Sequence, residues 1–449
     1  MTHTISPAPP ASAAQRSAAR RNLAGTGVGN ALEWFDWSIY STFAPFFAAS
    51  FFDATDPVSA FLSTLVVFAV GFVARPIGGA LFGRLSDRIG RKRTLSLTMV
   101  TIAAASLVIG ITPSYETIGV AASIILVVAR LAQGLAYGGE QPAAGAFLSE
   151  QAPPERRGLW SSLVYFSGTI GAASGMALGA ILAAAFGTEA LGTWAWRIPF
   201  IVAGCSGLFA LYMRSRMTET EQFTATLEVP VAAAGGSSAG RGLWRDFWRM
   251  RRSALTVMGM GVGLTVAYYF WVVAAAAFSI AVLGSDATQV LFASLLANLV
   301  FIAVLPLWGR LSDRIGRRPV QLIGILGTLV SILPLSQLID GDPVHLFAAM
   351  TVAGVLLAAP CAVSPAVMAE LFPTRVRTAG VAIPLAVTTA VFGGTSLYLQ
   401  TWMATAIGPN AFAIYVMVLL TISAVTVLLM PETKGRILTD NERDFQARP

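Results

Sequence analysis

Two acidic residues stand inside the first long hydrophobic stretch of the chain. Glu33 and Asp36 lie within GNALEWFDWSIY, residues 29–40, among aromatic and aliphatic side chains. A charged side chain at the centre of an isolated membrane helix costs about 2.5–3.5 kcal/mol on insertion scales, so two of them need a reason. Residues three apart lie on one face of a helix. The pair is therefore a candidate site for the uptake and release of a proton.

Two arginines are placed to meet these acids. Arg75 and Arg130 also lie well inside apolar stretches, and a rise of ~1.5 Å per residue puts both near the depth of the acids. Glu140 adds a third acid, roughly 15 Å along its helix from Arg130. Lipid offers no partner for charge, so these side chains must face the interior of a helix bundle. Three carboxylates against two arginines leave one acid in excess.

An acid without a full counter-ion in a low-dielectric cavity favours its protonated form. Arginine keeps its charge, so it does not carry the proton itself. We expect Asp36 or Glu33 to be protonated and released in turn, with Arg130 and Arg75 as modulators or as ligands for an anion. The alternative is that Asp36 with Arg130, and Glu33 with Arg75, are static pairs that fix helix packing.

The composition places these residues in a membrane protein. Hydrophobic residues make up 55% of the chain and charged residues only 12%, against roughly 25% charged in a typical soluble domain. Runs of about 20 apolar residues are long enough to cross a bilayer as a helix, and strand-type alternation is absent. The sequence predicts an all-α integral membrane protein with twelve transmembrane helices, near 23–51, 58–82, 95–112, 118–147, 159–186, 196–213, 254–280, 288–308, 320–338, 345–370, 379–406 and 411–430.

The positive charge lies almost entirely on one side of this predicted topology. With twelve spans, all but three of the 30 Lys and Arg residues fall in the tails and loops of the side that carries both termini. The exceptions are Arg75, Arg130 and Arg197, the last near the other surface. The positive-inside rule therefore predicts cytoplasmic termini. The net charge of +7 reflects topology and does not indicate a nucleic-acid partner.

An internal repeat divides the chain. The sequence GRLSDRIGR occurs at 83–91 and again, letter for letter, at 309–317. Two parallel six-helix repeats are a known transporter plan, with the substrate site near the midplane between them. The expected organisation is a disordered cytoplasmic tail over 1–22, six-helix halves over 23–214 and 253–430, a cytoplasmic linker with a basic amphipathic helix over 215–252, and a cytoplasmic tail over 431–449.

The duplicated loop carries charges of both signs. Its arginines can pair with a loop aspartate and with the glutamate that ends the fourth or the tenth span, and a nearby helix N-terminus also favours a negative charge. We expect two gating networks, Asp87, Arg91 and Glu150 in the first half and Asp313, Arg317 and Glu370 in the second. The alternative is that these loops only fix the topology.

Several motifs resemble a known family. The loop GRLSDRIGRKRTL, its copy, and RLAQG resemble signatures of the major facilitator superfamily. GNALEWFDW, RPIGGALFG, RLAQGLAYGGE, WAWRIPF and ELFPTRVR together resemble its metabolite:proton symporter branch, to which alpha-ketoglutarate, shikimate, citrate and proline-betaine permeases belong. The resemblance implies the major facilitator fold and a rocker-switch carrier that imports organic acids or amino-acid-like osmolytes with protons. The fifth span lacks the proline of drug antiporters, which argues mildly against export.

We therefore expect a carrier of the bacterial inner membrane, surrounded by lipid and monomeric. It imports a small organic acid, most simply a (di)carboxylate, by proton symport with alternating access, and needs no cofactor or metal. The alternatives are uptake of a zwitterion such as betaine or proline, a proton-driven exporter, and a transporter-like sensor. An enzyme is not expected, since the chain has two histidines and no catalytic or metal-ligand motif. Candidate cavity residues are Tyr165, Tyr268, Tyr269, Asn298, Tyr398 and Gln400.

Overall fold

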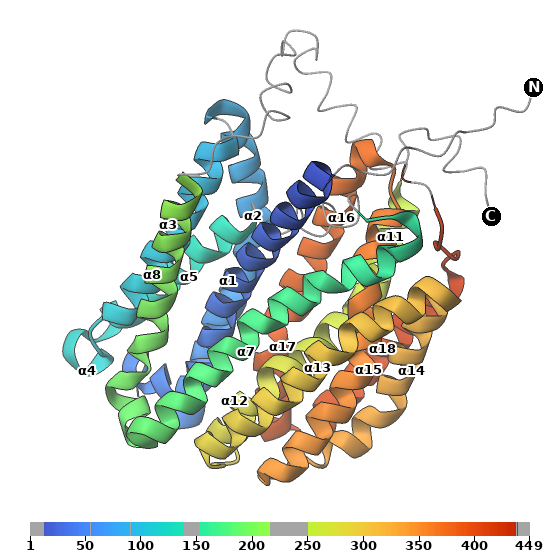
Figure 1. Ribbon diagram of the computed structural model, residues 1–449. Coiled ribbons are helices and arrows are strands. Elements are labelled where there is room, and N and C mark those ends of the chain that lie inside the picture. Colours follow the sequence, from blue (N-terminus) through green and yellow to red (C-terminus); the bar gives the residue numbers. More distant parts are fainter. Residues whose placement is uncertain are drawn as a thin grey trace, which may run out of the picture.

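The computed structural model describes residues 13–53, 55–89, 91–138, 152–215, 250–436 and 438. Nearly all of these residues are helical, and no strand occurs among them. The predicted all-α class is confirmed. The helices run up and down in one bundle, and the two halves of the chain lie beside one another (Figure 1).

The helices follow one another as the hydrophobic runs predict. The first half contains α1 (Ala13–Phe51), α2 (Pro57–Ile89), α3 (Arg91–Ile111), α4 (Tyr115–Ile118), α5 (Val120–Gly138), the 3-10 turn η1 (Pro154–Arg156), α7 (Arg157–Ala190), the π-helical η2 (Leu191–Ala195) and α8 (Arg197–Ser215). The second half contains α11 (Arg251–Tyr268), η4 (Tyr269–Ala274), α12 (Ala275–Ala281), α13 (Ala287–Ile315), α14 (Arg317–Ser336), α15 (Pro343–Glu370), α16 (Thr374–Thr388), η5 (Thr389–Gly393), α17 (Gly394–Ala406) and α18 (Ala411–Leu429). The segments η4 and η5 are π-helical and continue the helices on either side.

These elements account for the twelve predicted spans. Within the described residues, nine helical stretches are long and apolar enough to cross a membrane. Two further spans correspond to the shorter apolar segments Ser96–Ile111 and Arg197–Leu208, and the first corresponds to α1. Large apolar side chains such as Ile181, Val330 and Leu429 are exposed on the flanks of the bundle, where lipid would cover them.

Glycines bring the helices that carry the buried charges into backbone contact. A Cβ on Gly134 of α5 would lie only 2.1 Å from the carbonyl oxygen of Gly71 on α2. A Cβ on Gly171 of α7 would lie 1.9 Å from the carbonyl oxygen of Ala31 on α1. Any larger residue at either position would push these helices apart. The backbone of α5 therefore touches that of α2, and the backbone of α7 touches that of α1.

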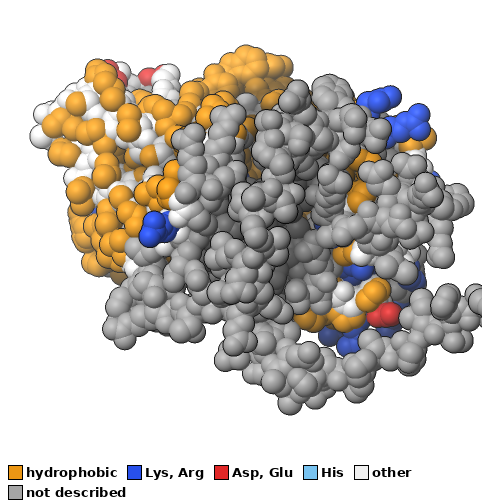
Figure 2. Space-filling model, turned by 90° about the horizontal axis from the view of Figure 1, so that it is seen from above, with side chains coloured by type: hydrophobic (Ala, Val, Ile, Leu, Met, Phe, Trp, Pro, Cys, Tyr) orange, Lys and Arg blue, Asp and Glu red, His pale blue; other side chains and the backbone are white. Residues whose placement is uncertain are grey.

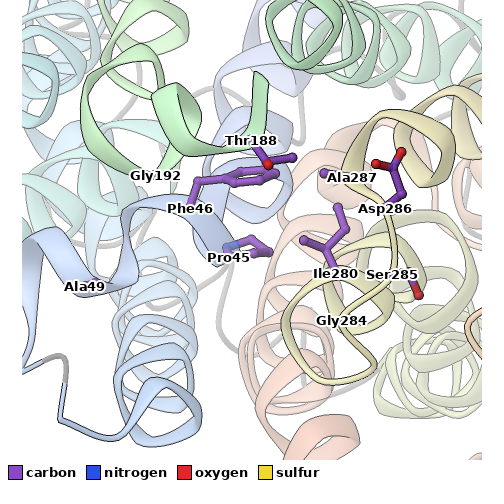
Figure 3. A pocket seen from close by; sticks show the side chains of 10 residues that line it. All are labelled: Pro45, Phe46, Ala49, Thr188, Gly192, Ile280, Gly284, Ser285, Asp286 and Ala287. Carbon is purple, nitrogen blue, oxygen red and sulfur yellow. The ribbon is translucent and has the colours of Figure 1, made fainter. Parts of the chain in front are cut away.

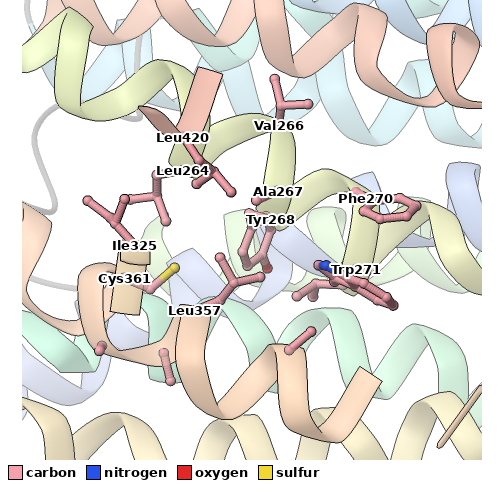
Figure 4. Close-up of a cluster of buried hydrophobic side chains, with 14 of the residues drawn as sticks. Leu264, Val266, Ala267, Tyr268, Phe270, Trp271, Ile325, Leu357, Cys361 and Leu420 are labelled. Carbon is pink, nitrogen blue, oxygen red and sulfur yellow. The ribbon is translucent and has the colours of Figure 1, made fainter. Parts of the chain in front are cut away.

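The buried apolar side chains form two clusters, one for each half. One consists mainly of residues from 37–203, and the other of residues from 254–430. Figure 4 shows part of the second, where Tyr268, Leu357 and Cys361 from two helices lie together. Each half thus has a core of its own.

The two halves also contact one another. The helices α7 and α13 lie side by side (Figure 1). We call the end of the bundle at which α1 begins and α18 ends the terminal end, and the other the opposite end. Figure 2 looks onto the terminal end; most of the described Lys and Arg side chains in view gather on one side of this face, and the flank on the other side is largely hydrophobic.

Candidate functional site

The carboxylate of Asp36 is the centre of a polar cluster built from three helices. Its side chain is only 5% exposed. The Asp36 Oδ2 atom accepts hydrogen bonds from the Tyr137 hydroxyl at 2.7 Å and from Gln133 Nε2 at 3.1 Å, both on α5. The hydroxyl of Ser106 on α3 donates to Asp36 Oδ1. Three neutral donors therefore hold this buried carboxylate.

Arg130 is connected to this cluster through Gln133. The guanidinium is fully buried, and its Nη1 donates to Gln133 Oε1 at 2.8 Å. The same amide donates through Nε2 to Ser106 Oγ at 2.8 Å. The Nε and Nη2 atoms of Arg130 are buried without a hydrogen-bond partner among the described residues. An amide thus separates the two charged groups, and two guanidinium donors are available to a ligand.

Aromatic rings surround both arginines. Arg75 Cζ lies 4.0 Å from the ring centroid of Trp37, and Arg130 Cζ lies 4.3 Å from the same ring. Arg75 also contacts the ring of Phe72 at 4.3 Å, and Arg130 the ring of Tyr40 at 4.1 Å. Guanidinium groups are attracted to the negative face of such rings, more strongly when water is excluded. The rings therefore stabilise two like charges in one apolar layer.

The other predicted members of this layer are placed differently. Glu33 is half-buried one turn before Asp36, and its carbonyl oxygen lies 3.5 Å from the Tyr137 hydroxyl. Glu140 lies outside the described residues. Glu33, Asp36, Arg75 and Arg130 therefore share one region, as their depths along the helices predict.

The predicted cavity residues of α7 and α11 lie where the halves meet. Trp34, Tyr165 and Tyr268 form a triangle of edge-to-face rings with centroids 5.7 to 5.8 Å apart. Tyr269 packs on Phe72 of the first half, with centroids 5.5 Å apart. These rings form an aromatic layer between the halves.

Two of the remaining cavity candidates, Asn298 and Tyr398, contact residues of the first half. Asn298 Nδ2 of α13 is 3.3 Å from the sulfur of Met176 on α7. Tyr398 packs against the apolar cluster of the first half. Gln400 is buried, and its Oε1 has no hydrogen-bond partner among the described residues.

A second charged network joins the halves at the terminal end. Glu370 Oε1 is 2.9 Å from Arg157 Nη1 of α7 and 3.4 Å from Arg317 Nη2. Arg317 Nη1 also lies 2.7 Å from Asp313 Oδ1, and Glu370 Oε2 accepts from the Thr433 hydroxyl at 2.7 Å. Since Arg157 belongs to the first half and its partner to the second, the network links them.

The N-terminus of α7 adds to this link. The Asp313 carboxylate accepts hydrogen bonds from the backbone N–H groups of Gly158 at 2.8 Å and Leu159 at 2.9 Å. A helix N-terminus carries partial positive charge and unsatisfied N–H groups, so it binds a carboxylate well. Asp313, Arg317 and Glu370, which the sequence predicts as one network, lie together, and Arg157 joins them without having been predicted. Glu150 and the side chains of Asp87 and Arg91 lie outside the described part of the chain.

A cavity of about 660 Å³ lies between the halves at the opposite end. Figure 3 shows its lining, which α1, α7 and η2 supply from the first half, and α12, the loop after it and the first residue of α13 from the second. Asp286 is the charged residue in this lining. No motif in the sequence pointed to these residues.

Sequence reasoning also missed the donors around Asp36. Gln133 and Tyr137 lie three and seven residues after Arg130 on α5, a spacing that places all three on one face of the helix. The sequence could therefore have indicated these two donors. Ser106 had none, because its partner is a distant helix.

The comparisons with known proteins cover nearly the whole chain. Residues 26–280 match the family model described as Major Facilitator Superfamily, and residues 229–445 match the model described as Sugar (and other) transporter. The alpha-ketoglutarate permease of Escherichia coli (strain K12) is 34% identical over 92% of this chain and 94% of that protein. The proline/betaine transporter of the same strain is 30% identical over 93% of this chain and 85% of that protein.

A solved structure resembles the fold as well. The xylose transporter XylE from E. coli, in a partially occluded inward open conformation, superimposes with a TM-score of 0.69. The match covers 94% of this chain and 100% of that chain, at 18% sequence identity. At this identity the likeness concerns the fold alone.

Proposed function

Because the chain belongs to the major facilitator superfamily, whose twelve-helix fold it has, we propose that it imports a small organic acid together with a proton. It is a multi-pass membrane transporter of small metabolites rather than an enzyme. The observation that carries the proposal is the hydrogen-bonded chain from Asp36 through Gln133 to Arg130. It links a buried acid, through one amide, to a cation with two donors that have no partner among the described residues.

An anionic substrate suits the two arginines. A guanidinium offers parallel N–H donors that match the two oxygens of a carboxylate. The Nε and Nη2 atoms of Arg130 form such a pair of donors, and Arg75 shares its aromatic neighbour Trp37. Two cations in one apolar layer fit a dicarboxylate better than a neutral solute. The relative named alpha-ketoglutarate permease supports this substrate class.

The proton would bind at Asp36, with Glu33 as the second candidate. In our proposal the substrate site and the proton site are exposed to one side of the membrane at a time. The network of Arg157, Asp313, Arg317 and Glu370 closes the terminal end in one state and parts in the other. Asp87, Arg91 and Glu150 remain predicted members of a matching network in the first half.

A zwitterionic osmolyte is the second candidate. The edge-to-face rings of Trp34, Tyr165 and Tyr268 lie between the halves, and aromatic rings are the usual partners of quaternary ammonium groups. The relative named proline/betaine transporter supports this candidate. Betaine or proline would then place its carboxylate on an arginine and its cation among the rings.

The membrane orientation is part of the proposal. The terminal end carries the basic loops, so we place it in the cytoplasm of the bacterial cell, with the opposite-end cavity facing outward. We propose that the monomer is the working unit, because each chain contains both halves.

Uptake into proteoliposomes tests the proposal. Labelled alpha-ketoglutarate, proline and glycine betaine are offered with and without an imposed proton gradient. We expect alpha-ketoglutarate to accumulate only with the gradient and a protonophore to abolish the accumulation. Accumulation of proline or betaine alone would select the second candidate. Equilibration that ignores the gradient would exclude symport.

A further inference from the structure

The amide of Gln133 lies between Asp36 and Arg130, and its hydrogen bond with Arg130 fixes its orientation. Its side chain is 1% exposed. The Oε1 atom accepts from Arg130 Nη1, and Nε2 donates to both Asp36 Oδ2 and Ser106 Oγ. Because a guanidinium only donates hydrogen bonds, the amide oxygen must face Arg130. Arg130 thereby forces the amide to present a donor to Asp36.

The other donors to Asp36 are not fixed in this way. The hydroxyls of Ser106 and Tyr137 both donate and accept, so each can rotate to meet a protonated carboxyl group. The carbonyl oxygen of Glu33, 3.5 Å from the Tyr137 hydroxyl, is a second acceptor for the Tyr137 proton. Gln133 is therefore the donor that opposes protonation of Asp36 for as long as Arg130 holds it.

Arg130 has further N–H donors that can bind a substrate in place of Gln133. Its Nε and Nη2 atoms are buried and have no hydrogen-bond partner among the described residues. A substrate carboxylate on these two atoms makes the paired bonds that a guanidinium favours. It neutralises the guanidinium charge and draws the group toward itself, which weakens the bond from Nη1 to Gln133.

We propose that Gln133 couples the binding of an anion at Arg130 to the protonation of Asp36. When Nη1 releases Oε1, the amide turns over and Oε1 takes the place of Nε2 beside Asp36. Asp36 takes one proton from the aqueous solution and donates it in a hydrogen bond to Oε1. Gln133 acts as a positioning residue, since it acts through its two neighbours.

This inference rests on the proposed function and gives it a direction. If a bound anion increases the affinity of Asp36 for a proton, the bound proton increases the affinity for the anion by the same factor, because coupling between two binding events is reciprocal. The anion and the proton therefore load together, as symport requires. The titratable and charged groups around Asp36 are Glu33 and Tyr40 on α1, Arg75 on α2, Arg130 and Tyr137 on α5, Tyr165 on α7 and Tyr269 on η4.

Infrared spectroscopy of the full-length protein without substrate tests the inference directly. The carbonyl stretch that is lost in Asp36→Asn reports the protonated form of Asp36. Gln133→Met keeps the side-chain length and removes the amide, with all the charged groups left in place. We expect the band to persist to a pH about one unit higher in this variant, because one donor to the carboxylate is gone. An unchanged midpoint would overturn the inference.

The control is a second buried glutamine. Gln321 on α14 is also 1% exposed and lies in the other half, so Gln321→Met should leave the midpoint where it is. If Gln133→Met does not fold, Gln133→Asn takes its place. Its amide is one methylene shorter and cannot reach both Arg130 and Asp36, so the same shift is expected.

Binding of alpha-ketoglutarate at a series of pH values separates the inference from the proposed substrate. For one linked proton, the wild-type affinity falls about tenfold per pH unit above the midpoint. Gln133→Met should still bind but lose most of this dependence. An equally steep dependence in the variant would overturn the inference. If the wild-type protein does not bind this probe, the proposed substrate fails and the infrared result alone decides the inference.

Discussion

Asp36 in the first half and Glu370 at the terminal end are both buried carboxylates, but they are surrounded by opposite kinds of donor. Glu370 lies between the guanidiniums of Arg157 and Arg317, at 2.9 and 3.4 Å. Asp36 accepts from three neutral groups, and the Gln133 amide connects it to the cation of Arg130. Protonating Glu370 would take the carboxylate away from Arg157 and leave Arg317 with Asp313 alone, whereas the hydroxyls around Asp36 can rotate to accept a proton. The first arrangement ties helices together, and the second can exchange a proton.

Removing the charge of Asp36 should have the largest effect. Asp36→Asn keeps the size of the side chain but cannot cycle a proton. We expect it to abolish accumulation driven by a proton gradient and to spare exchange between equal substrate pools. Uptake and counterflow in the same proteoliposomes measure both.

A surface aspartate provides the control for this variant. Asp340 lies in the loop before α15 and pairs with His345 at 2.8 Å. Asp340→Asn should leave accumulation and exchange unchanged. If Asp36→Asn still accumulates substrate, the proton binds elsewhere and Glu33 becomes the candidate.

Removing the charge of Glu370 should weaken the ion-pair network that joins the two halves at the terminal end. In Glu370→Gln the buried guanidinium of Arg157 loses its carboxylate partner and Arg317 keeps only Asp313, and breaking a buried ion pair costs about 3–5 kcal/mol. We expect a lower melting temperature and faster alkylation of Ser161→Cys, whose parent hydroxyl donates to the carbonyl of Ala362 across the seam. The exposed Cys205 is replaced by serine for this measurement. Unchanged alkylation would show that the network does not hold this end closed.

Replacing Arg130 by lysine should have a smaller effect, on substrate affinity. Arg130→Lys keeps the charge but loses the parallel pair of donors. We expect the KM to rise about tenfold, which corresponds to about 1.4 kcal/mol. Arg197→Lys is the matched control, since Arg197 donates to the carbonyl oxygens of α3 and the loop after it, away from the proposed site. An equal rise in both variants would remove Arg130 from the substrate site.

Removing the charge of Asp313 should have the smallest effect. Asp313→Asn retains one acceptor for the α7 N-terminus, and Arg317 still has Glu370 as a counter-ion after its pair with Asp313 is lost. The charge that this end of a helix attracts is removed, for which about 1 kcal/mol is typical. We expect a decrease of a few degrees in the melting temperature and nearly normal transport. A decrease as large as that of Glu370→Gln would show that Asp313 belongs to the essential tie.

Much of the fold and part of the site follow from the sequence. The apolar runs predict the spans because backbone polar groups in lipid must bond within a helix. Counting residues along these spans places Glu33, Asp36, Arg75 and Arg130 in one layer. The repeated GRLSDRIGR loop likewise marks Asp313 and Arg317.

What the sequence did not predict depends on contacts between distant segments. Ser106 reaches Asp36 because α3 packs against α5, and nothing near Ser106 in the sequence indicates this. Thr433 likewise donates to Glu370 from a segment 63 residues away, and no motif links the two. The π-helical segments η2, η4 and η5 also have no signal in the hydrophobic periodicity.

The close approach of α2 and α5 at Gly134 has a kinetic consequence. Because the two backbones touch there, Arg75 and Arg130 keep their spacing and the rearrangement at Gln133 is the rotation of one side chain. A buried side chain such as Gln133 turns more slowly than an exposed one, but its rotation requires none of the domain movement that takes microseconds to milliseconds. Protonation would then precede the movement of the halves. A change of pH would alter the fraction of carriers ready to cross, and leave the duration of each crossing unchanged.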